Sequence, residues 1–409
     1  MQVKSKYKQT DIGQIPEEWS VRKLSEIAAV ERGKFTARPR NDPQYYGGVV
    51  PFIQTGDVTN SNGYISTYSQ TLNDLGLGVS KLFPANTLFF TIAANIGDVG
   101  IATFETAATD SLVAISSRSS IEKLWLYYEL SSRKRKFESI ATQNAQMNIN
   151  LEKLRPYLIP VPPLSEQRAI ATALSDADAL INSLDRLIAK KRDIMQATMQ
   201  RLLTGRTRLP GFSGKWETKL LGELCSKIID GTHFTPSYVP DGIPFYSVEN
   251  VTANDFQNTK FISKQEHEIL SKRCKPERGD ILLTRIGSIG DTKLIDWDVN
   301  ASIYVSLALL QTNASFHSPY LYCYTKSKQF IKDIEARSLM NAAPKKINMG
   351  EIKDVPIRTP ASRAEQVAIA QLLMDLDAER TILEQRRNKA FLLKQGMMQE
   401  LLSGRTRLI

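Results

Sequence analysis

The chain has 409 residues, which is enough for two or three domains of ordinary size. Hydrophobic residues make up 42% of it and charged residues 23%, which excludes a disordered, a collagen-like or a membrane-embedded chain. Lysine and arginine number 53 against 43 acidic residues, and this net charge of +10 suggests a polyanionic partner.

The cysteines and the N-terminal segment indicate the compartment. Cys225, Cys274 and Cys323 have no C-x-x-C spacing, so neither a disulfide framework nor a zinc site is expected. The N-terminal segment has no apolar core of the kind that signal peptides contain, and the uncharged stretches are too short or too interrupted to cross a bilayer. We therefore expect a cytoplasmic protein that does not associate with a membrane.

Residues 1–163 read as a mixed α/β block in which strands dominate. Segments such as V-V-P-F-I-Q-T and T-L-F-F-T-I-A are short, β-branched or aromatic, and bounded by Gly, Asn, Asp or Pro. One helix is expected near residues 121–139, with aromatic residues at 125, 127 and 128 that belong to a core rather than to a base-stacking surface. The same helix carries a basic run that is either a solvated face or a set of phosphate contacts: Arg133, Lys134, Arg135 and Lys136.

Two further segments of this block carry candidate amide side chains. The turn T-I-A-A-N-I-G-D at 91–98 contains Asn95, and a later loop contains Asn144 and Gln146. Amide side chains are suited to reading base edges, although loop solubility is the competing explanation. Asp98 follows Gly in the turn, where a capping role is favoured over metal binding.

Residues 164–209 predict one long helix. Apolar residues from Ile170 to Leu202 follow a 4-3 spacing that is broken at Lys191, Pro162-Pro163 precede the start, and Gly205 follows the end. About 38 residues at 1.5 Å per residue give a rod of roughly 57 Å. A single helix of this kind cannot bury its apolar stripe alone.

Residues 210–360 form a second mixed α/β block, with a strand at D-I-L-L-T-R-I and a helix near 319–336. The turn T-R-I-G-S-I-G-D at 284–291 contains Arg285 and Ser288, and a later loop contains Lys345 and Lys346. These four residues are the candidates for DNA contact in this block, where basic side chains replace the amides of the first block.

The last segment, residues 361–409, repeats the first long helix. The string L-T-G-R-T-R-L at 203–209 returns as L-S-G-R-T-R-L at 402–408, and 21 of 45 aligned positions in 165–209 and 364–408 are identical. Weaker matches continue upstream, for example between Trp19 and Trp216. The chain is therefore an internal duplication.

The duplication predicts the fold class: α+β, with two globular blocks of mixed α/β character joined by two long antiparallel helices in a coiled coil. Each helix can bury its apolar stripe on the other, and the intervening block of about 150 residues permits the antiparallel pairing. The two blocks would then sit at opposite ends of the rod and be related by a pseudo-twofold repeat. The matching helices suit two copies of one partner, whereas the differing blocks suit two different DNA sequences.

Catalytic motifs are missing from the sequence. There is no Asp/Asn-Pro-Pro-Tyr/Phe motif of the kind that adenine methyltransferases use, no G-x-G-x-x-G and no G-x-x-x-x-G-K-[ST]. All three histidines lie in the second half without metal or relay spacing. We therefore expect a protein without catalytic, cofactor-binding or metal-binding residues of its own.

Several segments resemble the specificity subunit of type I restriction–modification systems. They are the opening I-P-E-E-W-S-V-R-K-L, the segment I-N-L-E-K-L-R-P-Y-L-I-P-V-P-P-L-S-E-Q-R-A-I-A with its weaker copy from Ile347, and the doubled L-[TS]-G-R end. The resemblance covers essentially the whole chain. It implies two target-recognition domains (1–163 and 210–360), each binding half of a bipartite double-stranded DNA site, and two spacer helices (164–209 and 361–409).

The resemblance also implies partners: two modification (methyltransferase) subunits and the restriction (motor and nuclease) subunits. S-adenosylmethionine, ATP and magnesium would belong to those partners, and no cofactor to this chain. Three alternatives stay open: a self-contained restriction or methyltransferase enzyme, a scaffold without DNA specificity, and the specificity subunit of a related two-subunit system outside type I.

Overall fold

The computed structural model describes residues 6–142, 148–339 and 341–408. Contacts divide the chain into two compact units, each described here by itself: unit 1 is Met1–Leu184 with Arg386–Ile409, and unit 2 is Asp185–Gln385. Each unit is therefore built from one globular block and parts of both long helices. No helix within the described residues is both long and apolar enough to span a membrane.

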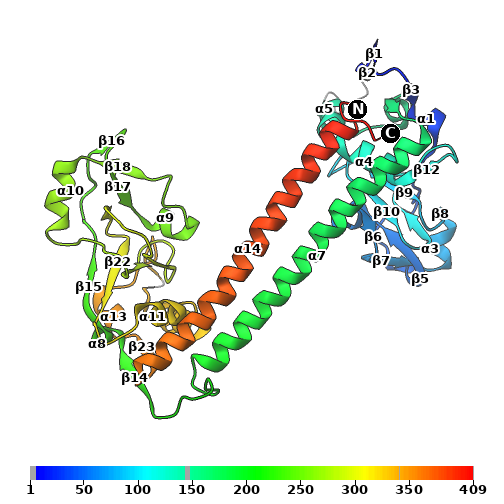
Figure 1. Ribbon diagram of the computed structural model, residues 1–409. Coiled ribbons are helices and arrows are strands. Elements are labelled where there is room, and N and C mark those ends of the chain that lie inside the picture. Colours follow the sequence, from blue (N-terminus) through cyan, green and yellow to red (C-terminus); the bar gives the residue numbers. More distant parts are fainter. Residues whose placement is uncertain (1–5, 143–147, 340, 409) are drawn as a thin grey trace. The chain divides into compact units, whose positions relative to one another are not determined.

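The globular block of unit 1 is rich in short strands (Figure 1). Its elements in chain order are β1 Tyr7–Thr10, β2 Gly13–Pro16, β3 Ser20–Lys23, α1 Leu24–Ile27, β4 Ala28–Arg32, the 3-10 helix η1 Pro43–Tyr45, β5 Tyr46–Ile53, α2 Thr55–Thr59, β6 Tyr64–Ile65, β7 Gln70–Leu72, α3 Asp74–Gly78, β8 Leu82–Phe83, β9 Leu88–Thr91, β10 Val99–Ala102, β11 Thr106–Ala108, β12 Leu112–Ser117, α4 Lys123–Ser132, α5 Lys134–Thr142, α6 Leu151–Leu154 and β13 Leu158–Val161.

The globular block of unit 2 repeats this order with fewer strands. Its elements are β14 Trp216–Leu220, α8 Leu221–Leu224, β15 Cys225–Asp230, β16 Tyr238–Val239, β17 Ile243–Tyr246, α9 Val248–Ala253, β18 Lys260–Ile262, α10 Lys264–Ser271, β19 Ile281–Thr284, β20 Thr292–Leu294, β21 Ser302–Ile303, β22 Leu307–Thr312, α11 Ser318–Thr325, α12 Lys328–Arg337, α13 Met349–Lys353 and β23 Pro356–Pro360.

The main sheets of the two units have the same topology. Strands run β4-β12-β9-β10-β6 in unit 1 and β15-β22-β19-β20 in unit 2, so the first four positions correspond. A second sheet has the order β7-β5-β11-β8 in unit 1 and β16-β18-β17-β21 in unit 2, and it contains a parallel pair in each case, β5 with β11 and β17 with β21. The mixed α/β character and the duplication predicted from the sequence are confirmed.

The helices that follow the main sheets differ from the prediction. One helix was expected in each block, near residues 121–139 and 319–336, but each block has two, α4 with α5 and α11 with α12. In unit 2 the break falls where the Ser327 hydroxyl accepts a hydrogen bond from the backbone N–H of Phe330 and so starts a new helix. The expected core role of the aromatic residues is confirmed for Trp125 and Tyr128, which are buried.

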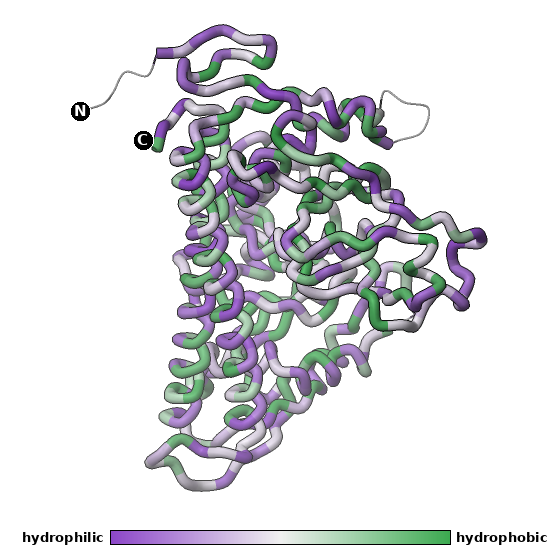
Figure 2. The backbone as a smooth tube through the Cα atoms, turned by 90° about the vertical axis from the view of Figure 1, so that its right-hand side faces the viewer, coloured by the Kyte–Doolittle hydropathy of each residue, from purple (hydrophilic) through white to green (hydrophobic). Residues whose placement is uncertain are grey.

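The two long helices are α7 Leu164–Leu202 and α14 Arg363–Leu401. α7 begins at the first residue of the predicted segment 164–209, and α14 begins two residues into the predicted segment 361–409. Hydrophobic and hydrophilic residues alternate along them on the scale of a helical turn (Figure 2). Most of the predicted seam residues of α7 are buried: Ile170, Leu174, Ile181, Leu184, Ile188 and Leu202. Ala177 and Met195, which the same spacing included, are only half-buried.

The direction of the helix pairing can be read within each unit. In unit 1, Glu166 pairs with Arg407, and Asp178 pairs with Lys394. Residue numbers therefore increase along one segment while those of their partners decrease along the other. In unit 2, Lys191 at the break of the predicted seam pairs with Glu379 at 2.5 Å. The pairing is antiparallel, as the sequence predicts.

The repeated L-[TS]-G-R-T-R-L segments make the same ion pair in both units. In unit 1, Arg407 donates to the buried Glu166 at 2.6 and 2.9 Å, and the indole of Trp19 donates to the same carboxylate at 2.9 Å. In unit 2, the equivalent Arg208 pairs with the buried Glu365. Each end therefore anchors the start of the other helix.

The glutamines that follow these glutamates also match. Gln167 accepts a hydrogen bond from the backbone N–H of Glu122 at 2.8 Å, and Gln366 accepts one from the backbone N–H of His317 at 3.0 Å. Both amides also donate to a proline carbonyl just before the helix. The repeated Glu-Gln pair thus joins each helix to the start of the helix that follows the sheet of the same unit.

Candidate nucleic-acid interface

The two copies of the predicted turn connect equivalent strands. The segment 91–98 joins β9 to β10, and 284–291 joins β19 to β20. In each turn the threonine hydroxyl accepts a hydrogen bond at 2.9 Å from the backbone N–H of the aspartate, Asp98 in one case and Asp291 in the other. Gly97 has a φ of +88°, a conformation that favours glycine, and the equivalent glycine of unit 2 has +93°. The repeated residues of the turn are thus those that fix its shape.

The aspartates of both turns are held by neighbouring side chains. Asp98 pairs with Lys134 at 2.5 Å and accepts a hydrogen bond from Thr59 at 2.8 Å. Asp291 accepts hydrogen bonds from Ser288 at 2.5 Å and from Thr252 at 3.3 Å. Among residues 6–142, 148–339 and 341–408, no group of three or more His, Cys, Asp or Glu side chains is placed to hold a metal ion. The geometry favours the turn role for both carboxylates.

The structure brings each turn next to the later loop that was predicted to work with it. In unit 2, Ile286 forms a β-bridge with Lys346, and the N–H of Gly287 donates to the carbonyl oxygen of Lys345 at 2.9 Å. Ser288 lies in the same turn, and the side chains of both lysines are exposed. The turn with Ser288 and the loop with the two lysines, which are remote in the sequence, therefore lie side by side.

Unit 1 has the same arrangement around Asn95. Ala93 bridges to Asn148, which ends the later loop, and the Asn95 amide, itself exposed, donates to the hydroxyl of Thr59 at 3.1 Å. The other two amide candidates, Asn144 and Gln146, lie outside the residues that the structure describes.

The basic run of unit 1 is mostly compensated within the unit. Arg133 pairs with the buried carboxylate of Glu129 at 2.5 Å, and Lys134 pairs with Asp98. The ammonium of Lys136 lies over the ring of Tyr157, 5.6 Å from its centre, and Arg135 is exposed. Phosphate contact by the whole run would compete with these internal interactions.

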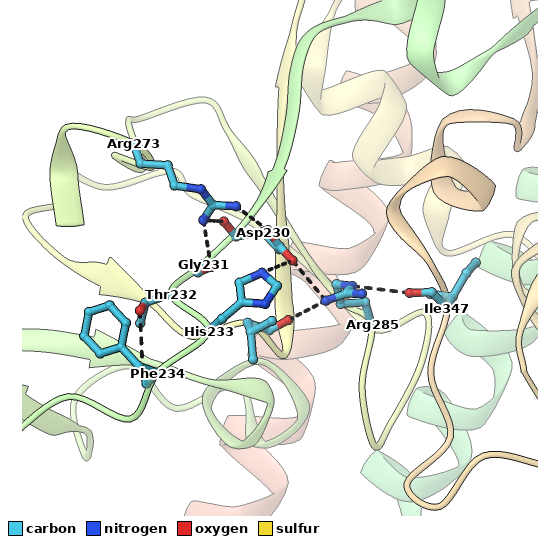
Figure 3. Close-up of polar contacts among 9 residues, drawn as sticks. Asp230, Gly231, Thr232, His233, Phe234, Arg273, Arg285 and Ile347 are labelled. Carbon is cyan, nitrogen blue, oxygen red and sulfur yellow. Dashed lines mark hydrogen bonds and ion pairs between the residues drawn. The ribbon is translucent and has the colours of Figure 1, made fainter.

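Arg285 occupies a different environment from the one expected. Only 7% of it is exposed, and its guanidinium donates to Asp230 at 3.1 Å and to the carbonyl oxygens of Val305 and Ile347 (Figure 3). Burial lowers the pKa of Arg285, while the carboxylate of Asp230 acts in the opposite direction. Direct contact with a base, which the sequence predicts, would require this ion pair to open.

Asp230 is the centre of a polar cluster that the sequence reasoning missed. Its carboxylate accepts hydrogen bonds from Arg285 and, at 2.7 Å, from Arg273, and it lies 2.9 Å from the imidazole of His233 (Figure 3). In unit 1 the equivalent of Arg285 is Ile92. The ion pair is therefore a property of unit 2 that distinguishes its loops from those of unit 1.

The loop after β4 and its counterpart after β15 were also missed. Each begins with a glycine whose added Cβ would lie 2.0 Å from a backbone carbonyl oxygen, Gly33 against Thr109 and Gly231 against Ile303. Both glycines are followed shortly by Phe-Thr, and this shared signal could have identified the loops. The exposed side chains differ: Lys34, Arg38 and Arg40 in unit 1, and His233 and Phe234 in unit 2.

A family model agrees with this duplicated architecture. The model described as the type I restriction modification DNA specificity domain matches residues 16–190 and again residues 213–391. The two matches together cover most of the chain and fall on the two repeats.

Curated proteins and a solved structure are also similar to this chain. A putative type I restriction enzyme specificity subunit of Methanocaldococcus jannaschii, MjaX, is 27% identical over 98% of this chain and 96% of its own. The EcoBI specificity subunit of Escherichia coli is 23% identical over 63% of this chain and 59% of its own. A crystal structure of the S subunit of a type I restriction–modification system from M. genitalium has a TM-score of 0.65 at 18% identity, covering 98% of this chain and 99% of that one.

Proposed function

Because the chain belongs to the type I restriction modification DNA specificity family, we propose that it is the DNA-recognition subunit of a type I restriction–modification enzyme. Its two globular blocks would act as target-recognition domains that each bind one half of a bipartite, asymmetric site. The observation that carries the proposal is the duplication: sheets of the same topology position loops with different exposed side chains. Lysine and arginine contacts to phosphates would supply affinity, and the polar loop residues would select bases.

We propose that the chain is non-catalytic, since its sequence contains no motif for methyl transfer or nucleotide hydrolysis. The cysteines support this role. Burial raises the pKa of Cys225 and Cys323 to about 12 and that of Cys274 to about 11, so these thiols stay protonated at neutral pH and are poor nucleophiles. S-adenosylmethionine, ATP and magnesium would act on the modification and restriction subunits.

The test of this function is methylation mapping. The chain should direct sequence-specific DNA methylation when it is produced together with its modification subunit, and the modification subunit alone should methylate no bipartite motif. Methylation by the isolated chain with S-adenosylmethionine would contradict the non-catalytic role. Loss of methylation only on removal of this chain would support it.

The exposed leucines of α14 support docking of a modification subunit on the long helices. Within unit 1, Leu392 and Leu393 are 65% and 64% exposed, and Phe391 beside them is also exposed. Consecutive residues of a helix point in different directions, so this apolar cluster is spread around α14. Exposed apolar surface of this kind is typical of a protein–protein contact. We expect a helix of the modification subunit to cover this cluster.

Replacing Leu392 and Leu393 by aspartate should weaken binding of the modification subunit at least 10-fold. Each leucine buried in a contact contributes about 1.5–3 kcal/mol, and the new charges would have to be desolvated. Titration of the purified subunits measures the effect. Leu75→Asp is the matched control because Leu75 is 63% exposed but lies on α3, away from the long helices. Equal affinity of the double variant and the wild type would exclude this docking surface.

A further inference from the structure

A pocket of 340 Å³ in unit 2 is lined in part by Arg273. Figure 3 shows that Arg273 and Arg285 lie on opposite sides of Asp230. Three of the residues that line the pocket, His233, Phe234 and Arg273, are exposed and are called the rim here. Ile269, Leu270 and Cys274 also line it. Because burial keeps the Cys274 thiol protonated, that part of the lining is uncharged at neutral pH. The pocket thus combines an apolar lining with a charged rim.

Arg273 is held in place at the rim. Its guanidinium donates to the carboxylate of Asp230 at 2.7 Å and to the backbone carbonyl oxygens of Asp230 and Gly231 at 2.7 and 2.8 Å (Figure 3). The side chain is nevertheless 49% exposed. An arginine that is already fixed in this way loses little conformational entropy when it binds a ligand.

The charges around the rim favour an anion. The single carboxylate of Asp230 is shared by two arginines, Arg273 and Arg285, so the cluster keeps a net positive charge. The ammonium of Lys227 donates to the carbonyl oxygen of Arg273 at 2.8 Å. The carboxylate of Asp280, which acts on the Cys274 thiol together with Asp230, offsets this cation, so the net positive charge comes from the two arginines. A planar guanidinium is well suited to a phosphate group.

The rim also offers apolar surface next to the guanidinium. The side chains of Phe234 and Ile269 are both more than half exposed. His233 directly precedes Phe234 in the sequence. A ligand that satisfies both features carries an anionic group attached to a compact, weakly polar body. The sugar–phosphate unit of a nucleotide has this chemistry.

We propose that this pocket binds one nucleotide unit of the half-site that unit 2 recognises, with the phosphate on Arg273 and the deoxyribose against Phe234. The proposal rests on the proposed function and adds a binding site to it. Asp230 acts as a positioning residue, because its other contact, through Arg285, fixes the carbonyl groups of Val305 and Ile347. Asp230 thereby fixes the position of the phosphate-binding Arg273 relative to the loop that carries Lys345 and Lys346.

The test uses the complex of the full chain with its modification subunit and a duplex that contains the methylated motif. Arg273→Met should weaken DNA binding about 10-fold and reduce the slope of log affinity against log salt by about one, because one phosphate contact is lost. Arg278→Met is the matched control: Arg278 is exposed on the following loop and pairs only loosely, at 3.4 Å, with the exposed Asp298. It should change neither quantity.

Phosphate ethylation interference identifies the contact directly. In the wild type, ethylation of one phosphate in the unit 2 half-site should interfere with binding, and this signal should vanish in Arg273→Met. Asp230→Asn should weaken the same signal although Arg273 keeps its charge, which a purely electrostatic role would not predict. If the methionine variant melts early, Arg273→Lys decides, since it keeps the charge but lacks the planar fork: the signal should be weakened at the same phosphate.

If a folded Arg273 variant shows the affinity, the salt slope and the interference pattern of the wild type, this result would overturn the proposal that the pocket binds a nucleotide, while leaving the proposed function intact. Absence of sequence-specific methylation with the wild-type chain would instead overturn the proposed function itself.

Discussion

Replacing Arg407 by methionine is expected to destabilise unit 1 by about 3–5 kcal/mol, because it leaves the buried carboxylate of Glu166 without its cationic partner. For a unit of about 200 residues this corresponds to a fall of roughly 10 °C in the midpoint of its thermal unfolding. The hydrogen bonds to Glu166 raise the pKa of Arg407, and the hydrogen bond from Arg407 lowers the pKa of Glu18.

Arg405, two residues earlier, provides the matched control. It is 60% exposed and pairs with Glu400 on the surface, so Arg405→Met should change the free energy of unfolding by no more than about 0.5 kcal/mol. Adding Glu166→Gln to Arg407→Met should recover part of the loss, since the uncompensated charge is then removed. Calorimetry of the three variants measures this, and equal unfolding midpoints for Arg407→Met and Arg405→Met would contradict the role of the repeated end.

Exchanging residues 1–163 for the corresponding block of another family member is expected to change one half of the methylated motif and leave the other half unchanged. The reason is that each globular block packs a core of its own within its unit, around Trp19 and Trp125 in unit 1 and around Tyr320 in unit 2. Since each wrong base pair costs about 1–3 kcal/mol, three changed positions suffice to reduce methylation of the original motif to background.

The donor block must keep the residues that join it to the long helices. Trp19, which donates to Glu166, is the main one. The backbone N–H that donates to Gln167 is supplied by any residue except proline at position 122. Mapping of methylated sites in cells that produce the chimaera and the modification subunit gives the result. The reciprocal exchange of residues 210–360 is the control and should alter the other half only. A change in both halves after either exchange would refute independent recognition.

Much of the fold could be predicted because its signals are local or repeated. The spacing of Ile170, Leu174, Ile181, Leu184 and Ile188 marks the buried face of α7, and the structure buries each of them. The antiparallel pairing followed from the duplication, since two matching apolar stripes can bury each other. The extra break in the helices after the main sheets was not predicted, because Ser327 caps a helix only through its conformation in the folded chain.

The candidate site was predictable only in part. The turns with Asn95 and Ser288, and the loop with Lys345 and Lys346, were found because they occupy matching places in the two repeats. In the sequence, Arg285 could not be distinguished from the exposed candidates of the same turn. Its burial and its ion pair with Asp230 depend on a strand that ends 55 residues earlier. No local pattern reports such a contact.

The sequence by itself therefore determined the duplication, the two long helices and the family, because these depend on periodicity and on recurring strings. Only the tertiary structure decided which charged side chains are available to a ligand. Two arginines that look alike in the sequence have different surroundings in the fold. Arg285 is buried and neutralised by the carboxylate of Asp230, whereas Arg273 is held half-exposed by the same carboxylate. That difference is set by burial and by distances between segments that are remote in the chain.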